Sequence, residues 1–201
     1  MDLARERGDA VARLPAGGRI HEMHLRLARR LEQARLPDAD RARVLEANAA
    51  ALLHRQSVLR DEEHFEALHP TRTLLILLDD CDVVDADVLE AAPAVESEHD
   101  SLRAQQGNKL AAIVPIPADA ERLMEDLVVA SGEVRLLALA ERLDHARHLH
   151  LREGGTWAEF HRSIGAVYRP IAHRTHPRLA RRYDWWWRMF ERRFLAPDKG
   201  V

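Results

Sequence analysis

Cysteine and long apolar runs are what this sequence has least of. Cys81 is the only cysteine, so no disulfide can form within the chain and nothing favours an oxidising compartment. No run of about 18 apolar residues occurs, which argues against a membrane-spanning helix. Residues 1–19 are charged and contain no apolar stretch, so we expect no signal peptide there. These absences predict a cytoplasmic protein with no membrane partner.

Strand patterns are also scarce. Alternating runs of β-branched residues are absent, and only residues 111–116 could form a short strand. Hydrophobic residues make up 46% and charged residues 31% of the 201 residues, which is typical of one globular domain and not of a disordered chain. The formal net charge of −3 gives no general attraction to nucleic acids or membranes.

Apolar residues recur instead at helical spacing, with prolines, glycines and capping residues between the segments. Asp38 can cap one helix, Pro70 suits the first turn of another, and Ser131 can cap a third. Pro93 should kink or restart the helix that contains it. We predict helices over residues 20–35, 41–59, 69–78, 88–103, 118–130, 134–150, 156–173 and 177–195. The expected fold is a compact all-α bundle of about eight helices, one domain over residues 20–195 with tails at 1–19 and 196–201.

Three stretches form an ordered set of motifs. They read His69-Pro70-Thr71-Arg72-Thr73 with Val88-Leu89-Glu90-Ala91-Ala92 further on, then Val134-Arg135-Leu136-Leu137-Ala138-Leu139-Ala140-Glu141-Arg142-Leu143, then Tyr168-Arg169-Pro170-Ile171-Ala172-His173-Arg174. In this order they resemble the hydrolase domain of the RelA/SpoT family and its small single-domain relatives, over roughly residues 45–195. The resemblance implies an HD-domain helical bundle.

The resemblance also implies a divalent metal, typically manganese, that activates water to hydrolyse the 3′-pyrophosphate of (p)ppGpp. The family's first histidine ligand matches His69. Its consecutive His-Asp pair falls on Val95-Glu96, and its last aspartate is replaced by Glu141. The metal would therefore be held by His69, Glu96 and Glu141, a set that lacks the central histidine. Whether a metal is bound at all stays open at this point.

A second His-Asp pair could repair this set. His99-Asp100 stands about one helical turn after Val95 and would reach the metal if the helix restarts at Pro93. The candidate catalytic residues are therefore Glu96, His99 and Asp100. The simpler interpretation, which we prefer, places His99-Asp100 on a solvated helix face.

A second repair could come from the helix that contains Glu141. Glu141, His145 and His148 share one helical face, so His145 could replace a lost ligand. Here too we prefer the simpler interpretation, with His145 and His148 exposed to solvent.

Basic residues that would bind the nucleotide are few. Arg55 and Arg142 are the candidates, and Arg142 keeps the arginine that the family has beside the last metal ligand. A guanine nucleotide is the ligand that the resemblance implies. Outside the motifs, His21 and His24 are expected on the surface, and Cys81 in a solvated acidic turn, where negative neighbours disfavour a reactive thiolate.

Arginines and tryptophans gather near the end of the chain. Between Arg169 and Arg193 eight arginines face two carboxylates, a formal charge of +6. Trp185, Trp186 and Trp187 are consecutive, and successive helical residues turn by about 100°, so at least one should lie at the surface. A homo-oligomer or a protein partner could bind there. Nucleic acid is not expected, because no recognised module accompanies the charge.

Three functions follow from these observations. The first is a catalytically impaired HD domain that acts as a nucleotide-sensing or interaction module, and the altered ligand set favours it. The second is an active metal-dependent pyrophosphohydrolase with a rearranged ligand set. The third is a partner-binding protein that uses its C-terminal Arg/Trp helix.

Overall fold

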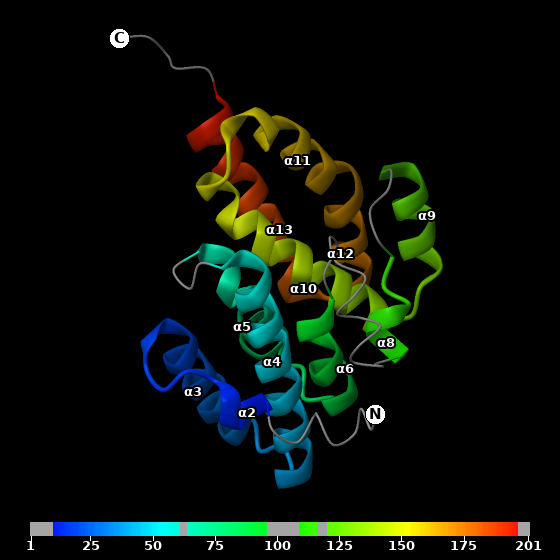
Figure 1. Cartoon of the computed structure of the whole chain (residues 1–201). Helices are drawn as coiled ribbons and strands as arrows, with labels where there is room; N and C mark the ends of the chain where they lie inside the picture. The colour runs from blue at the N-terminus through cyan, green and yellow to red at the C-terminus, as the bar shows by residue number, and fades with distance from the viewer. Residues whose placement is uncertain (1–9, 61–63, 96–108, 116–119, 197–201) are drawn as a thin grey trace. The chain divides into compact units, whose positions relative to one another are not determined.

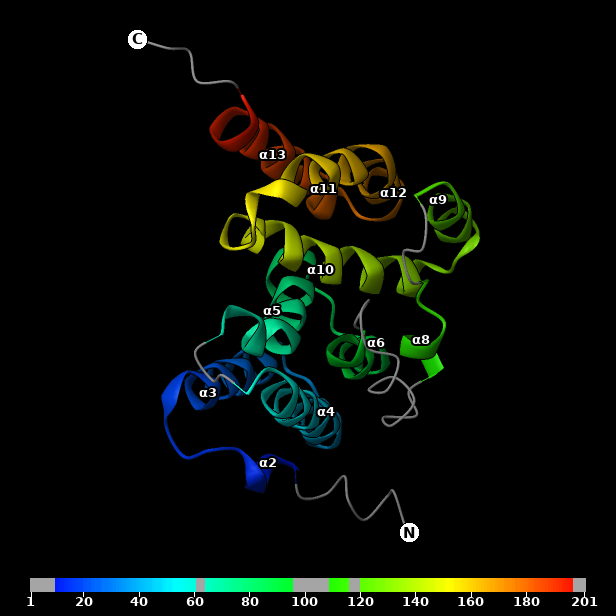
Figure 2. The ribbon, with the colours of Figure 1, turned by 45° about the horizontal axis from the view of Figure 1, so that its top comes forward.

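The computed structural model describes residues 10–60, 64–95, 109–115 and 120–196, and these form helices and turns. Within these ranges no residue is in a strand, which confirms the all-α prediction. The chain divides into two compact units, Met1–Val114 and Pro115–Val201, each with its own packed helices (Figures 1 and 2). The assignment of residues 20–195 to one domain stays a prediction.

Unit 1 is organised around one long helix. Its elements are α2 (Ala10–Arg13), α3 (Gly18–Gln33), α4 (Asp38–Leu59), η1 (Phe65–Leu68), α5 (His69–Leu75), η2 (Ile76–Asp80), α6 (Ala86–Ala91), η3 (Ala92–Ala94) and α8 (Lys109–Ala112). Helix α4 contacts α2, α3, α5 and α6. Apolar side chains from separate segments meet against it, such as Ile20, Leu52 and Leu68. Burial of these side chains fixes the positions of α3, α4 and η1 within the unit.

In unit 2 the helical segments of residues 157–190 lie on one side of the helix Gly132–His148 (Figure 2). The elements of unit 2 are α9 (Ala120–Val129), α10 (Gly132–His148), η4 (Leu149–Leu151), η5 (Gly154–Thr156), α11 (Trp157–Ser163), η6 (Ile164–Tyr168), α12 (Arg169–Thr175), α13 (Pro177–Phe190) and η7 (Glu191–Leu195). Helices α12 and α13 pack on each other, and both contact α10.

Several predicted helix ends are confirmed. Pro70 lies in the first turn of α5, where its missing N–H removes no helical hydrogen bond. Ser131 caps α10 by accepting a hydrogen bond from the Val134 backbone N–H at 3.4 Å. The cap predicted at Asp38 is wrong, because the helix begins one residue earlier. Pro37 is the cap residue, and Asp38 is the first helical residue and pairs with Arg41.

The helix predicted over residues 88–103 begins two residues earlier than predicted and is interrupted before Val95. It begins at Ala86, capped by Asp85, changes to a 3₁₀ turn at Ala92, and reaches extended backbone at Val95. Pro93 stands inside that turn, in agreement with its expected effect on the helix. Residues 96–103 lie outside the described residues. The strand considered over residues 111–116 is wrong at its start, because α8 continues to Ala112.

The three consecutive tryptophans of α13 face three directions, as the helical rotation predicts. Trp186 is buried among the apolar side chains of unit 2, Trp187 is half-buried, and Trp185 is 58% exposed. Their neighbours on the inner face, Tyr183 and Phe190, are also buried. This face anchors α13 to the rest of the unit.

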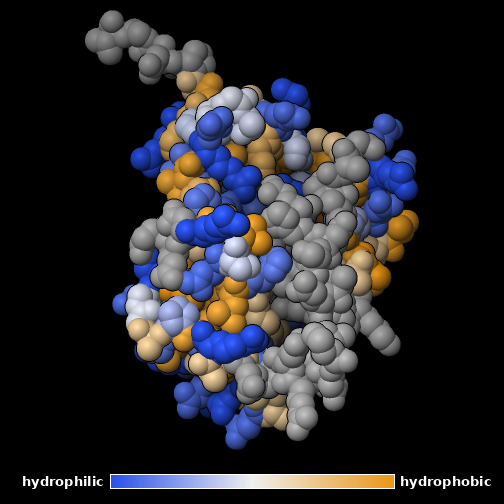
Figure 3. Space-filling model, in the orientation of Figure 1, coloured by the Kyte–Doolittle hydropathy of each residue, from blue (hydrophilic) through white to orange (hydrophobic). Residues whose placement is uncertain are grey.

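One face of the molecule shows how polar and apolar side chains are distributed at the surface. In the view of Figure 3, hydrophilic side chains cover much of the described surface, and apolar atoms form separate small areas between them. Among the described helices, none is long and apolar enough to cross a membrane.

Candidate metal and nucleotide residues

His69 stands at the junction of η1 and α5 in unit 1. Its side chain is 2% exposed, and Glu66, one helical turn earlier, is 6% exposed. These two residues offer an imidazole nitrogen and a carboxylate oxygen within 4.8 Å of each other. Imidazole and carboxylate are ligands that divalent transition metals accept, so the pair could hold part of a metal centre.

Glu66 is a site residue that the sequence interpretation missed. The available signal was its spacing, because a residue three positions before His69 lies on the same side of a helical turn. Two hydrogen bonds in η1 and α5 hold Glu66 and His69 in this arrangement. The His64 ring accepts from the Glu66 N–H at 3.2 Å, and the Thr73 hydroxyl donates to the His69 carbonyl at 3.1 Å.

The position where the resemblance expects the central histidine is apolar and inside the fold. Val95 follows η3 in extended backbone and is 2% exposed. A valine side chain has no donor atom for a metal. Glu96, His99 and Asp100, the candidate catalytic residues, lie outside the described residues, so their assignment stays a prediction.

Glu141 lies within α10 in unit 2, and its carboxylate is engaged by its own helix. The residue is 4% exposed, and its Oε1 stands 3.0 Å from Nε2 of His145, one turn further along. Its Oε2 stands 3.8 Å from Nε of Arg142. Both oxygens of the carboxylate that the resemblance assigns to the metal therefore face positive or proton-bearing groups.

A second contact sets the orientation of the His145 ring. Arg152 places its Nη2 2.9 Å from Nδ1 of His145. A guanidinium can only donate, so Nδ1 accepts this hydrogen bond, and Nε2 is the ring nitrogen that lies beside Glu141.

The expectation that His145 lies on a solvated face is wrong. His145 is 4% exposed, because α10 is the helix that α12 and α13 cover in unit 2. His148 is half-buried and lies against Asp144, whose backbone carbonyl is 2.8 Å from Nδ1 of His148. Asp144 itself is 1% exposed. The Asp144 carboxylate is also 3.4 Å from Nδ1 of His148, so α10 carries two carboxylate–imidazole pairs, each spanning one helical turn.

Arg142 is held inside unit 2 by aromatic side chains. Its Nε donates to the Tyr168 hydroxyl at 3.2 Å, and its guanidinium lies over the rings of Phe160 and Tyr168 at 5.4 and 5.2 Å from their centroids. Burial opposes its charge, but the Glu141 carboxylate and Tyr168 outweigh burial and raise the pKa of Arg142 above its usual value. Burial also raises the pKa of Tyr168.

The second candidate for nucleotide binding, Arg55, belongs to unit 1. It lies near the end of α4 and is 4% exposed. Both candidate arginines are therefore interior residues of their units.

His24 is buried, so its assignment to the surface is wrong. It is 6% exposed and lies within a chain of polar groups between α3, α4 and α5. Thr71 donates to Oδ1 of Asn48 at 2.9 Å, and Nδ2 of Asn48 lies 3.4 Å from Nδ1 of His24. Burial, and the charge of His21, lower the pKa of His24. Its spacing from Ile20 and Leu27 on the apolar face of α3 could have predicted this.

The acidic turn after η2 is also less solvated than expected. Cys81 is 6% and Asp80 7% exposed, because the π-turn of η2 directs them inward. Asp79 remains outside and binds Arg30 at 2.6 Å. Arg30 of α3 therefore neutralises part of the negative charge of this turn.

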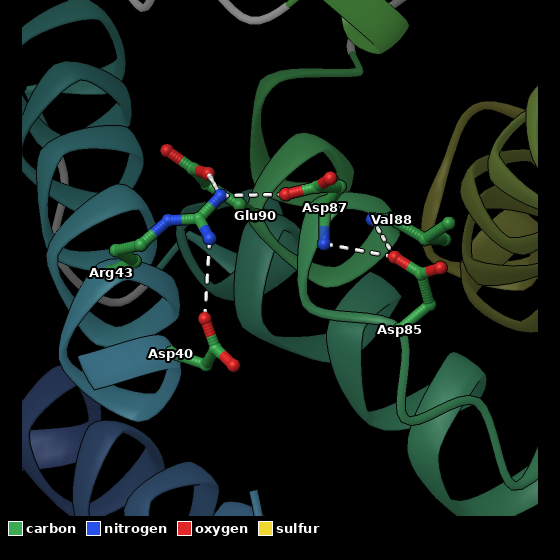
Figure 4. Close-up of polar contacts among 6 residues, drawn as sticks. All are labelled: Asp40, Arg43, Asp85, Asp87, Val88 and Glu90. Atoms are coloured by element: carbon green, nitrogen blue, oxygen red, sulfur yellow. Dashed lines mark hydrogen bonds and ion pairs between the residues drawn. The ribbon is translucent and has the colours of Figure 1, made fainter. Parts of the chain in front are cut away.

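A second ion-pair network joins α4 and α6 at the surface (Figure 4). Arg43 pairs with Asp40 at 3.2 Å, with Asp87 at 2.7 Å and with Glu90. The hydrogen bonds that Arg43 donates to Asp87 and Glu90 raise the pKa of Arg43. The network is largely exposed and holds two helices together without forming a site.

Comparisons with known proteins give no match. No protein-family model fits the chain, and no curated protein and no solved structure is significantly similar to it. The candidate site therefore depends on the residues and contacts of this chain alone.

Proposed function

We propose that this chain is an HD-type helical protein of the RelA/SpoT kind that binds a guanine nucleotide without efficient hydrolysis. The observation that carries the proposal is the state of Glu141. This residue is buried, its Oε1 lies 3.0 Å from Nε2 of His145, and its Oε2 lies 3.8 Å from Nε of Arg142.

The chemistry of hydrolysis explains why this matters. A metal-dependent phosphohydrolase needs several ligands that fix a cation and leave a position for the attacking water. Val95 contributes no ligand, and a cation at Glu141 would have to compete with the contacts that this carboxylate makes with His145 and Arg142. Breaking a buried charge contact is costly, because each partner loses its compensation away from water. The ligand set that the resemblance implies does not fit the residues present.

The test measures binding and hydrolysis in the same preparation. We expect isothermal calorimetry to detect ppGpp binding in EDTA, and we expect no pyrophosphate release when manganese is supplied. Absence of binding with and without manganese would overturn the sensing function. Manganese-dependent release of pyrophosphate would overturn the loss of catalysis.

A second function is favoured by one specific observation, the Glu66–His69 pair. If the chain is a hydrolase with a rearranged ligand set, this pair is the part of the set that the structure supports. His69→Ala and Glu66→Gln would then each abolish both manganese binding and pyrophosphate release. His150→Ala, which changes an exposed histidine, is the matched control. Pyrophosphate release that persists in both the His69→Ala and the Glu66→Gln variants would exclude this second function.

A further inference from the structure

The outer face of α13 carries a continuous stripe of arginines around one tryptophan. The stripe consists of Arg178, Arg181, Arg182, Trp185 and Arg188, all of them exposed. At about 100° per residue, these side chains fall within an arc of about 120° and cover about 15 Å of helix. Arg192, also exposed, continues the stripe in the next turn.

The stripe contains no carboxylate. Asp184 is the only acidic residue of α13, and by the same rotation it lies outside the arc. Its carboxylate is engaged toward α12, where it contacts Arg169 at 2.9 Å and His173 at 3.1 Å. Burial alone would raise the pKa of Asp184, but the contacts with Arg169 and His173 outweigh burial and lower that pKa. Every charged member of the stripe is therefore an arginine.

We propose that this stripe binds single-stranded nucleic acid, with arginines on the phosphates and Trp185 stacked on a base. Guanidinium groups recognise phosphate oxygens with two hydrogen bonds, and helical neighbours repeat about every 5.4 Å, a spacing suited to successive phosphates of a strand. Base stacking on an exposed aromatic ring does not depend on sequence and requires an unpaired base.

Two other kinds of partner fit the same face less well. A protein interface has an apolar core from which charge is depleted, whereas Trp185 is the only apolar member of the stripe. An amphipathic helix that enters a lipid surface needs a free apolar face. The apolar face of α13 is already used inside unit 2 by Tyr183, Trp186 and Phe190. The sequence alone could not favour nucleic acid, because spacing places these arginines on one helical face but does not show that this face is exposed.

The experiment measures binding of the full chain to fluorescein-labelled dT20 by anisotropy at several salt concentrations. The charge variant Arg181→Gln/Arg188→Gln should make the slope of log K against log salt less negative by about 1.4, which is the loss of two phosphate contacts. Trp185→Ala should weaken binding about 5- to 100-fold, the usual contribution of one stacked base. The matched control is Arg13→Gln/Arg29→Gln, which removes the same charge from exposed positions of unit 1.

Three results would overturn the proposal. The first is no binding of dT20 by the wild type at low salt. The second is an equal loss of affinity in the stripe and control variants, which would indicate non-specific attraction. The third is self-association of the wild type, seen by light scattering and abolished by Trp185→Ala, which would show that a second copy covers the stripe.

Discussion

His24 connects the stability of unit 1 to pH. Its pKa lies below the ordinary value of 6.5, first because it is buried and second because His21 is close. The unfolded chain therefore binds a proton that the folded chain does not, between the lowered pKa and 6.5. The contribution of neutral His24 to the free energy of unfolding is fully present above pH 6.5, and it is lost as the pH falls toward the lowered pKa.

This predicts that the free energy of unfolding falls between pH 7.5 and 5.5, and that His24→Gln reduces the fall. Urea denaturation at each pH measures the effect. His21→Gln is the control, and it should change the fall only slightly because His21 is the smaller cause. Identical pH dependence in His24→Gln and the wild type would contradict the assignment.

Tyr183 makes a hydrogen bond in the interior of unit 2. It is fully buried, and its hydroxyl donates to the Leu139 carbonyl of α10 at 2.6 Å. Burial also raises its pKa well above the usual value, which keeps the hydroxyl protonated. Tyr183→Phe should lower the free energy of unfolding by about 0.5–1.5 kcal/mol, the usual net contribution of one hydrogen bond. Urea denaturation measures it, and an unchanged midpoint would contradict the role of the hydroxyl.

Some of these residues could have been predicted from the sequence and others could not. The burial of His24 follows from its spacing with Ile20 and Leu27, and the position of Glu66 from its spacing with His69. The contact of Arg152 with His145 is different, because Arg152 follows the end of η4 and its direction depends on that turn. The spacing of Glu141 and His145 already placed them on one helical face, whereas the contact of Arg152 with His145 became visible only with the structure.

At the scale of elements, the start of α6 depends on one side chain. Asp85 accepts hydrogen bonds from the backbone N–H groups of Asp87 at 2.9 Å and Val88 at 3.2 Å (Figure 4). Asp85→Ala removes both and should cost about 1 kcal/mol of stability, the usual effect of losing an N-cap. Asp85→Asn keeps an acceptor oxygen and should retain most of the stability. Equal thermal midpoints for the Ala and Asn variants would show that the cap does not contribute.

The packing of η6 against α13 requires a glycine. A Cβ at Gly165 would stand 2.9 Å from Nε1 of Trp187. That indole has little room to move, since it stacks on His161 and lies under the Arg169 guanidinium. Gly165→Ala should therefore destabilise unit 2 by about 1–3 kcal/mol, as overpacking does. Gly155→Ala, where an added Cβ meets nothing, is the control, and an equal loss in both variants would contradict the argument.

The starts of several helices were easier to predict than the points where they end or change their helical type. Prolines, glycines and the Ser131 cap act locally, so the sequence indicated where most helices begin. The π-turns of η2, η6 and η7 were not predicted, because they leave the apolar spacing almost unchanged.

At the scale of the molecule, the formal charge is distributed unevenly along the chain. Residues 169–193 carry a formal charge of +6, which leaves −9 on the remainder of the chain. The arginine stripe lies in that positive segment, whereas the carboxylate–imidazole pairs lie inside the units. A variant of the stripe should therefore leave guanine-nucleotide binding unchanged.

Manganese stoichiometry tests the central claim most directly, namely that Glu141 is committed to His145 and Arg142 and does not hold a metal. The full chain is incubated with excess manganese at neutral pH, freed of unbound metal by gel filtration, and measured by mass spectrometry of the metal. We predict far less than one manganese per chain, and the same value for the wild type and Glu141→Gln. One manganese per chain in the wild type, lost in Glu141→Gln and in His69→Ala, would contradict the account.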